Sequence, residues 1–73
     1  MSPAAISPLS DREEDIVELL RLGLSNKEIA FELGLAEGTV KEYLFRIFRK
    51  TGASNRVQLA VRAERRSLLG CAF

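Results

Sequence analysis

The sequence contains no histidine and no tryptophan, and Cys71 is its only cysteine. A lone cysteine excludes an internal disulfide, and without histidine neither a Ser–His nor a Cys–His nucleophile pair can form. A zinc site draws about four ligands from Cys, His and carboxylates, and this set lacks the usual combinations. The ten carboxylates fall mostly at expected helix starts and on polar faces, where we expect solvation. The composition therefore predicts no enzyme activity, no metal and no cofactor.

Long apolar runs are also missing from the sequence. No segment approaches the roughly 20 apolar residues of a membrane helix, and no basic region followed by an apolar stretch marks a signal peptide. The 73 residues are 47% hydrophobic and 29% charged, which is typical of one small soluble domain. We expect a cytoplasmic protein with no membrane partner and no small-molecule ligand in this domain.

The net charge of +1 hides an asymmetry between the two halves of the chain. Residues 1–40 carry three basic and eight acidic side chains, a formal charge of −5, whereas residues 41–73 carry eight basic and two acidic ones, a charge of +6. A basic half suits a polyanion while an acidic half faces away from it. Scattered solvated charges on helices are the alternative interpretation.

Helical periodicity runs through most of the chain, and no segment alternates as a strand does. The expected helices span residues 10–22, 26–33, 37–51 and, from Ser54 or Asn55, to about Arg66. Ser10 with Glu13 and Ser25 with Glu28 fit the capping box, in which hydroxyl and carboxylate accept each other's backbone N–H. Two helices joined by a tight glycine-containing turn indicate a helix-turn-helix. The expected fold class is all-α, a compact four-helix bundle containing a helix-turn-helix.

The expected domain spans residues 9–66, between a flexible lead-in at 1–8 and an apolar tail at 67–73. Its third helix has two different faces at about 100° per residue. Core positions on one face are Val40, Leu44, Ile47 and Thr51. Positions on the opposite face are Gly38, Lys41, Glu42, Phe45 and Arg49.

Two motifs, SNKEIA at residues 25–30 and GTVK at residues 38–41, resemble the LuxR/GerE-type helix-turn-helix of bacterial transcription regulators. The likeness covers about residues 9–63. It implies a four-helix bundle whose second and third helices form the DNA reader, with the third in the major groove, and whose fourth often carries a dimer contact. Stand-alone members and output domains of larger response regulators both fit so short a chain.

By this resemblance the chain is expected to be a sequence-specific, homodimeric transcription regulator that binds double-stranded DNA through helix 37–51. The expected base-reading residues are Lys41, Glu42, Phe45 and Arg49. The expected phosphate contacts are Ser25, Asn26, Lys27, Thr39, Arg46, Lys50, Asn55 and Arg56. The expected dimer contacts are Val57, Val61, Leu68 and Leu69. Two roles stay open, since Ser25 can act as a cap alone and Arg56 can instead bridge to a carboxylate and lock the bundle.

Two residues of the reading face depart from the family pattern. Glu42 repels phosphate but can accept a hydrogen bond from the cytosine amino group, and Phe45 can pack on a thymine methyl. Alternatively, this face meets protein, and the domain is an interaction module that binds another regulator or RNA polymerase with weak or no DNA binding. A third possibility is that Phe45 folds back onto the edge of the bundle.

Two further departures concern stability. Ala36 stands where a capping serine is common, and the loss of such a cap costs about 1 kcal/mol. Thr51 stands where leucine is common, which predicts a looser core between the third and fourth helices.

Overall fold

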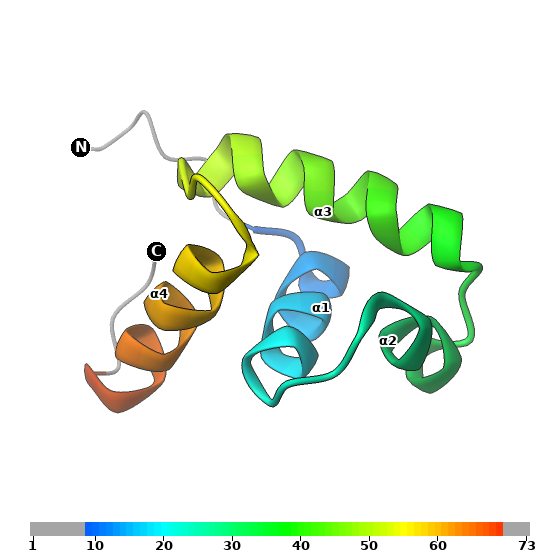
Figure 1. Ribbon diagram of the computed structural model, residues 1–73, viewed down its shortest axis with the longest axis horizontal. Helices are drawn as coiled ribbons and strands as arrows, with labels where there is room; N and C mark the ends of the chain where they lie inside the picture. The colour runs from blue at the N-terminus through cyan, green and yellow to red at the C-terminus, as the bar shows by residue number, and fades with distance from the viewer. Residues whose placement is uncertain (1–8, 70–73) are drawn as a thin grey trace.

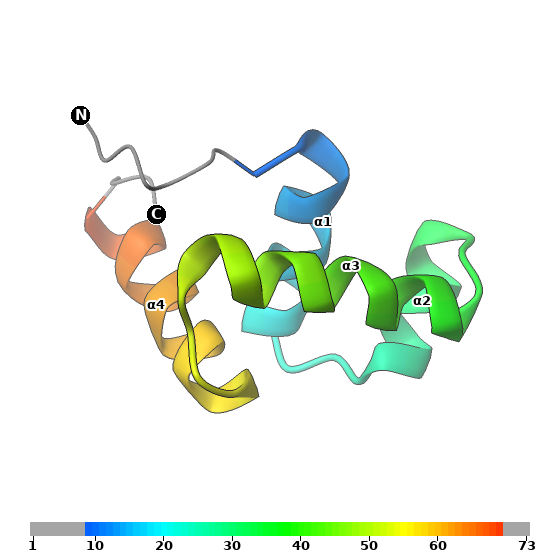
Figure 2. The ribbon, with the colours of Figure 1, turned by 90° about the horizontal axis from the view of Figure 1, so that it is seen from above.

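The computed structural model describes residues 9–69, with side chains through residue 65. Its helices are α1 (Asp11–Arg21), α2 (Asn26–Leu33), α3 (Glu37–Thr51) and α4 (Arg56–Leu69), and no strand occurs in this range. The long helix α3 crosses one side of the molecule, and α1, α2 and α4 lie beneath it (Figures 1 and 2). The all-α, four-helix prediction is confirmed.

Local sequence signals start and stop the first two helices as predicted. The Ser10 hydroxyl accepts the Glu13 N–H at 3.2 Å, while the Glu13 carboxylate accepts the Ser10 N–H at 2.8 Å. Ser25 and Glu28 repeat this reciprocal pair with the same distances. Gly34 then ends α2 with a φ of 69°, a left-handed conformation that a side chain would strain. The chain can therefore turn sharply from α2 into α3.

The hydrophobic core forms around α1, which contacts each of the other three helices. Its largest fully buried side chains are Ile16, Val17, Ile29, Val40, Ile47 and Leu59. The predicted inner face of α3 is confirmed for Val40, Leu44 and Ile47, all of which are buried. Because these side chains hold α3 on the bundle, its opposite face is left toward solvent.

Three features of the fold differ from the sequence analysis. Glu13 is not on a solvated face, since it is only 2% exposed. Helix α4 continues to Leu69 rather than ending at Arg66, so the first part of the expected tail is helical. Thr51 is half-buried, and its hydroxyl donates to the Ile47 carbonyl at 2.9 Å and accepts the Ala53 N–H at 3.3 Å. The threonine hydroxyl thus gains local hydrogen bonds where a leucine would add apolar contacts.

Candidate nucleic-acid interface

The outer face of α3 is open over its whole length. Lys41, Glu42, Phe45, Arg46 and Arg49 are all exposed. Seen from above, α3 lies in front of the other helices and none of them covers it (Figure 2). Lys41, Arg46 and Arg49 are cations that can contact phosphates or base edges. Phe45 offers an apolar surface, and Glu42 is a hydrogen-bond acceptor. The structure therefore brings the predicted base-reading residues together on one accessible surface.

Aromatic rings hold two of the arginines on this helix. The Cζ atom of Arg49 lies 5.6 Å from the ring centroid of Phe45, and that of Arg46 lies 5.6 Å from the ring centroid of Tyr43. A guanidinium over an aromatic face is attracted by the ring quadrupole. Phe45 keeps 62% of its surface exposed, so it does not fold back onto the edge of the bundle. The ring and its arginine form one unit in the middle of the face.

The segment that begins α2 contains Ser25, Asn26 and Lys27, and of these only Lys27 is exposed without a partner within the described residues. The Ser25 hydroxyl accepts the Glu28 N–H and so caps α2, which is the alternative role considered for Ser25. The backbone hydrogen bond from Ser25 lowers the pKa of Glu28 below its ordinary value, and the bond to the Ser25 hydroxyl adds to this. The carboxylate therefore stays ionised and holds the start of α2 in place.

Arg56 links the start of α4 to the start of α2. It donates to the Asn26 side-chain oxygen at 2.6 Å and to the Leu24 carbonyl at 2.7 Å. This is a bundle-locking contact of the kind considered for Arg56, made to an amide and a carbonyl rather than to a carboxylate. The neighbouring Asn55 is exposed, and its side-chain oxygen accepts the Gln58 N–H at 2.8 Å. Both residues therefore help to fix the N-terminus of α4.

Lys50 is turned toward α1 and away from the open face. Its ammonium group lies 2.8 Å from the Glu13 carboxylate. Burial raises the pKa of Glu13, but hydrogen bonds from Lys50 and from the Ser10 N–H outweigh burial, so the pKa lies below its ordinary value. No local pattern in the sequence predicts this ion pair, because its partners are separated by 37 residues. Thr39, the remaining predicted phosphate contact on α3, is half-buried near the start of that helix.

Helix α4 exposes two of the four predicted dimer contacts. Val57 is 72% exposed and Val61 is 50% exposed, one turn apart on the same side of the helix. The side chains of Leu68 and Leu69 lie outside the described residues. The structure thus shows an apolar stripe of two valines that nothing in the described chain covers.

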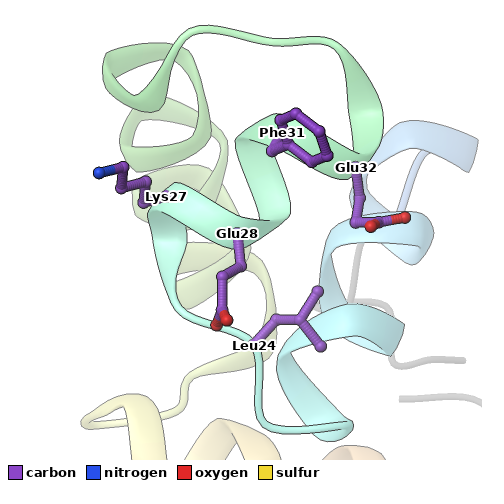
Figure 3. A pocket seen from close by; sticks show the side chains of 5 residues that line it. All are labelled: Leu24, Lys27, Glu28, Phe31 and Glu32. Atoms are coloured by element: carbon purple, nitrogen blue, oxygen red, sulfur yellow. The ribbon is translucent and has the colours of Figure 1, made fainter.

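A second exposed aromatic side chain lies on α2 rather than on α3, and it is not among the predicted site residues. Phe31 is 83% exposed, and it lines a shallow hollow with Leu24, Lys27, Glu28 and Glu32 (Figure 3). The sequence could have indicated this exposure, because Phe31 lies outside the buried stripe formed by Ile29, Ala30 and Leu33.

Elsewhere among the described residues, no cluster of His, Cys, Asp and Glu could hold a metal ion. No helix in this range has the length and apolar character needed to cross a bilayer.

Comparison with known proteins connects this geometry to a family. The family described as "Bacterial regulatory proteins, luxR family" matches residues 7–63. The transcriptional regulatory protein DesR of Bacillus subtilis is 40% identical over 58 residues, which cover 80% of this chain and 29% of DesR. The DNA-binding transcriptional activator DevR/DosR of Mycobacterium tuberculosis is 47% identical over 56 residues, which cover 77% of this chain and 26% of that protein.

A third relative, the CsgBAC operon transcriptional regulatory protein of Escherichia coli, is 46% identical over 50 residues, which cover 68% of this chain and 23% of that protein. No solved structure matches the chain significantly. The chain spans about a quarter of the length of these three relatives. The family match covers most of the chain and all of α1, α2 and α3, which confirms the resemblance seen in the sequence. The chain therefore belongs to the luxR family of bacterial regulatory proteins.

Proposed function

We propose that this chain is a sequence-specific DNA-binding transcription regulator that places α3 in the major groove of double-stranded DNA. The observation that carries the proposal is the open α3 face with Lys41, Glu42, Phe45 and Arg49 exposed together. A 15-residue helix is about 22 Å long, and the major groove, about 12 Å wide, admits one helix. The proposed DNA-binding domain spans residues 9–66 and acts in the cytoplasm.

Phosphate contacts on both sides of the groove would orient α3. Lys27 at the start of α2 and Arg46 on α3 are exposed, so their charges are available to phosphates without breaking an internal ion pair. Arg56 donates two of its five N–H groups to Asn26 and Leu24, so three donors remain for a phosphate. Lys50 contributes less directly, because binding a phosphate would require it to leave the buried Glu13.

The first test compares two charge deletions on a duplex at low salt. Lys41→Ala removes a cation from the open face and should lower affinity for every duplex at least severalfold, because it loses a charged contact to DNA. Arg12→Ala is the matched control, since it removes one positive charge from α1, where Arg12 pairs only weakly with Asp15 at 3.7 Å. Equal losses in the two variants, measured by fluorescence anisotropy, would contradict the assignment of the α3 face.

We further propose that the chain acts as a homodimer through the exposed stripe of Val57 and Val61 on α4. Two copies would then place their α3 helices about 34 Å apart, in successive major grooves on one side of the duplex. Val57 and Val61 lie one turn apart on one side of α4, so in a two-fold dimer the same two side chains of each copy can pack against each other.

One observation favours a second function. The exposed Phe45 is the kind of aromatic anchor that protein interfaces use, so the same face could bind another regulator or RNA polymerase. The charge of the surrounding residues favours DNA, because three cations and one carboxylate share that face. An interaction module predicts no salt-sensitive retention on any duplex, whereas a DNA reader predicts a steep loss of affinity with salt.

A further inference from the structure

The centre of the open α3 face is aromatic rather than polar. Phe45 keeps 62% of its surface exposed, and the Cζ atom of Arg49 lies 5.6 Å from its ring centroid. Glu42, one turn before Phe45, is also exposed. The ring is therefore accessible to a partner of this face, and a guanidinium lies beside it.

Major-groove chemistry limits what such a unit can read. Thymine offers the one apolar group among the base edges of the major groove, its C5 methyl, and guanine offers two acceptors that match the arginine fork. A guanidinium that stacks on a ring keeps its N–H donors free for hydrogen bonds in its own plane. One ring and one guanidinium in contact thus suit a thymine close to a guanine.

Helix geometry sets the separation of the two bases. Phe45 and Arg49 are four residues apart, about 6 Å along the helix axis, and base pairs are stacked about 3.4 Å apart. The two side chains therefore span one or two base-pair steps. The cations Lys41, Arg46 and Arg49 on the same helix favour DNA over a protein as the occupant of this surface.

We propose that Phe45 and Arg49 act as one recognition unit that selects a thymine one or two base pairs away from a guanine. Phe45 contacts the thymine methyl and holds Arg49 over its ring, and Arg49 pairs with O6 and N7 of the guanine. This inference rests on the proposed function and adds the identity of two bases in each half-site. It makes Phe45 a specificity-determining residue and a positioning residue for Arg49.

The test changes one chemical group of a base edge at a time. In a duplex obtained by selection from random sequences, each thymine is replaced in turn by deoxyuridine, which lacks only the methyl group. The wild-type chain should lose affinity about fourfold at one thymine in each half-site, as expected for one buried methyl group. Phe45→Ala should bind the thymine and uracil duplexes equally at that position.

The guanine is tested with 7-deazaguanine, which lacks the N7 acceptor. The wild-type chain should lose affinity at a guanine one or two base pairs from the sensitive thymine, and Arg49→Ala should show no such loss. Phe45→Leu keeps an apolar contact but no aromatic ring, so it should retain the uracil penalty and lose part of the 7-deazaguanine penalty. That pattern separates the positioning role of the ring from its contact with the methyl group.

Arg46→Ala is the matched control, since it removes an arginine that stacks on Tyr43 and leaves Phe45 unchanged. It should weaken binding to all duplexes alike and leave the thymine-to-uracil ratio intact. Sequence-selective binding without a uracil penalty at any thymine would overturn this inference and leave the proposed function standing. A uracil penalty that persists in Phe45→Ala would also overturn it. Absence of salt-sensitive binding to any duplex would instead overturn the proposed function, and this inference with it.

Discussion

The ammonium group of Lys50, in the last turn of α3, lies 2.8 Å from the carboxylate of Glu13, in the first turn of α1. The same carboxylate accepts the Ser10 N–H and so completes the capping box of α1. One buried side chain therefore both caps the first helix and anchors the end of the helix proposed to read DNA. Burying a charged carboxylate is costly unless it is paired and hydrogen-bonded, and Glu13 has both kinds of partner.

Glu13→Gln tests this double role through the pH dependence of stability. The folded-state pKa of Glu13 lies below its ordinary value of 4.5, so its contribution to stability is complete above that value and is lost as pH falls through the lower folded-state pKa. Glutamine keeps a cap acceptor but loses the ion pair, which should lower the free energy of unfolding by about 2 kcal/mol at pH 7. Urea unfolding from pH 7 to pH 3 should show that the difference in free energy of unfolding between wild type and Glu13→Gln shrinks below about pH 4.5.

Asp11→Asn serves as the control for Glu13→Gln. It removes an exposed carboxylate from the same helical turn, and it leaves the contact between Glu13 and Lys50 intact. It should reduce stability at pH 7 by about 0.5 kcal/mol, the scale of an exposed charge near a helix N-terminus. If the difference in free energy of unfolding between wild type and Glu13→Gln stays constant with pH, the ion pair adds no stability.

Arg56→Ala should destabilise the fold even in the absence of DNA. The substitution removes both hydrogen bonds that tie α4 to Asn26 and to the Leu24 carbonyl, at a cost of about 2 kcal/mol in urea unfolding. Arg65→Ala is the control on the same helix, because Arg65 is exposed and makes no hydrogen bond or ion pair within the described chain. Equal stability in the two variants would mean that the Arg56 hydrogen bonds do not stabilise the fold, which would leave DNA contact as the role of Arg56.

Ala36→Ser should stabilise the domain. Ala36 is the N-cap of α3, has extended backbone angles and supplies no side-chain hydrogen bond. A serine hydroxyl at this position can accept a backbone N–H of the first turn, as Ser10 and Ser25 do in α1 and α2, and should add about 1 kcal/mol to the free energy of unfolding. Thermal and urea unfolding measure the change, and a variant no more stable than wild type would contradict the assignment of a missing cap.

Val61→Asp should weaken self-association through α4. A charge placed in the proposed valine stripe would have to be buried in the dimer, which is unfavourable without a partner. Leu22→Asp is the control, since Leu22 is an exposed aliphatic side chain at the end of α1, outside that stripe. Sedimentation at high micromolar concentration should show dimers of the wild type and of Leu22→Asp but monomers of Val61→Asp. A monomeric wild type would remove the dimer proposal.

The parts of the fold that sequence predicts well are those set by neighbours in the chain. Ser25 and Glu28 are three residues apart, so the start of α2 follows from a local motif, and Gly34 marks its end through the left-handed conformation it adopts. The inner face of α3 follows from helical period alone, as Val40, Leu44 and Ile47 show.

The partners in contacts between distant segments were not predicted, although a bundle-locking contact of Arg56 with a carboxylate was considered. Lys50 and Arg56 both suit phosphate contact by residue type, yet in the fold they pair with Glu13 and Asn26, 37 and 30 residues away. No local pattern encodes those partners, because helix packing decides which polar groups meet. The same limit applies to Phe31, whose exposure depends on how α2 lies against α1 and α3.

Selection of binding sites from a pool of random duplexes is the most direct test of whether α3 reads DNA. If it does, paired half-sites about 10 base pairs apart, centre to centre, should be enriched, and affinity should fall steeply as salt rises. The enriched duplex should bind wild type and Arg12→Ala well and Lys41→Ala poorly. A pool that stays random after repeated rounds, with no duplex retained in a salt-dependent way, would contradict the claim that α3 reads DNA.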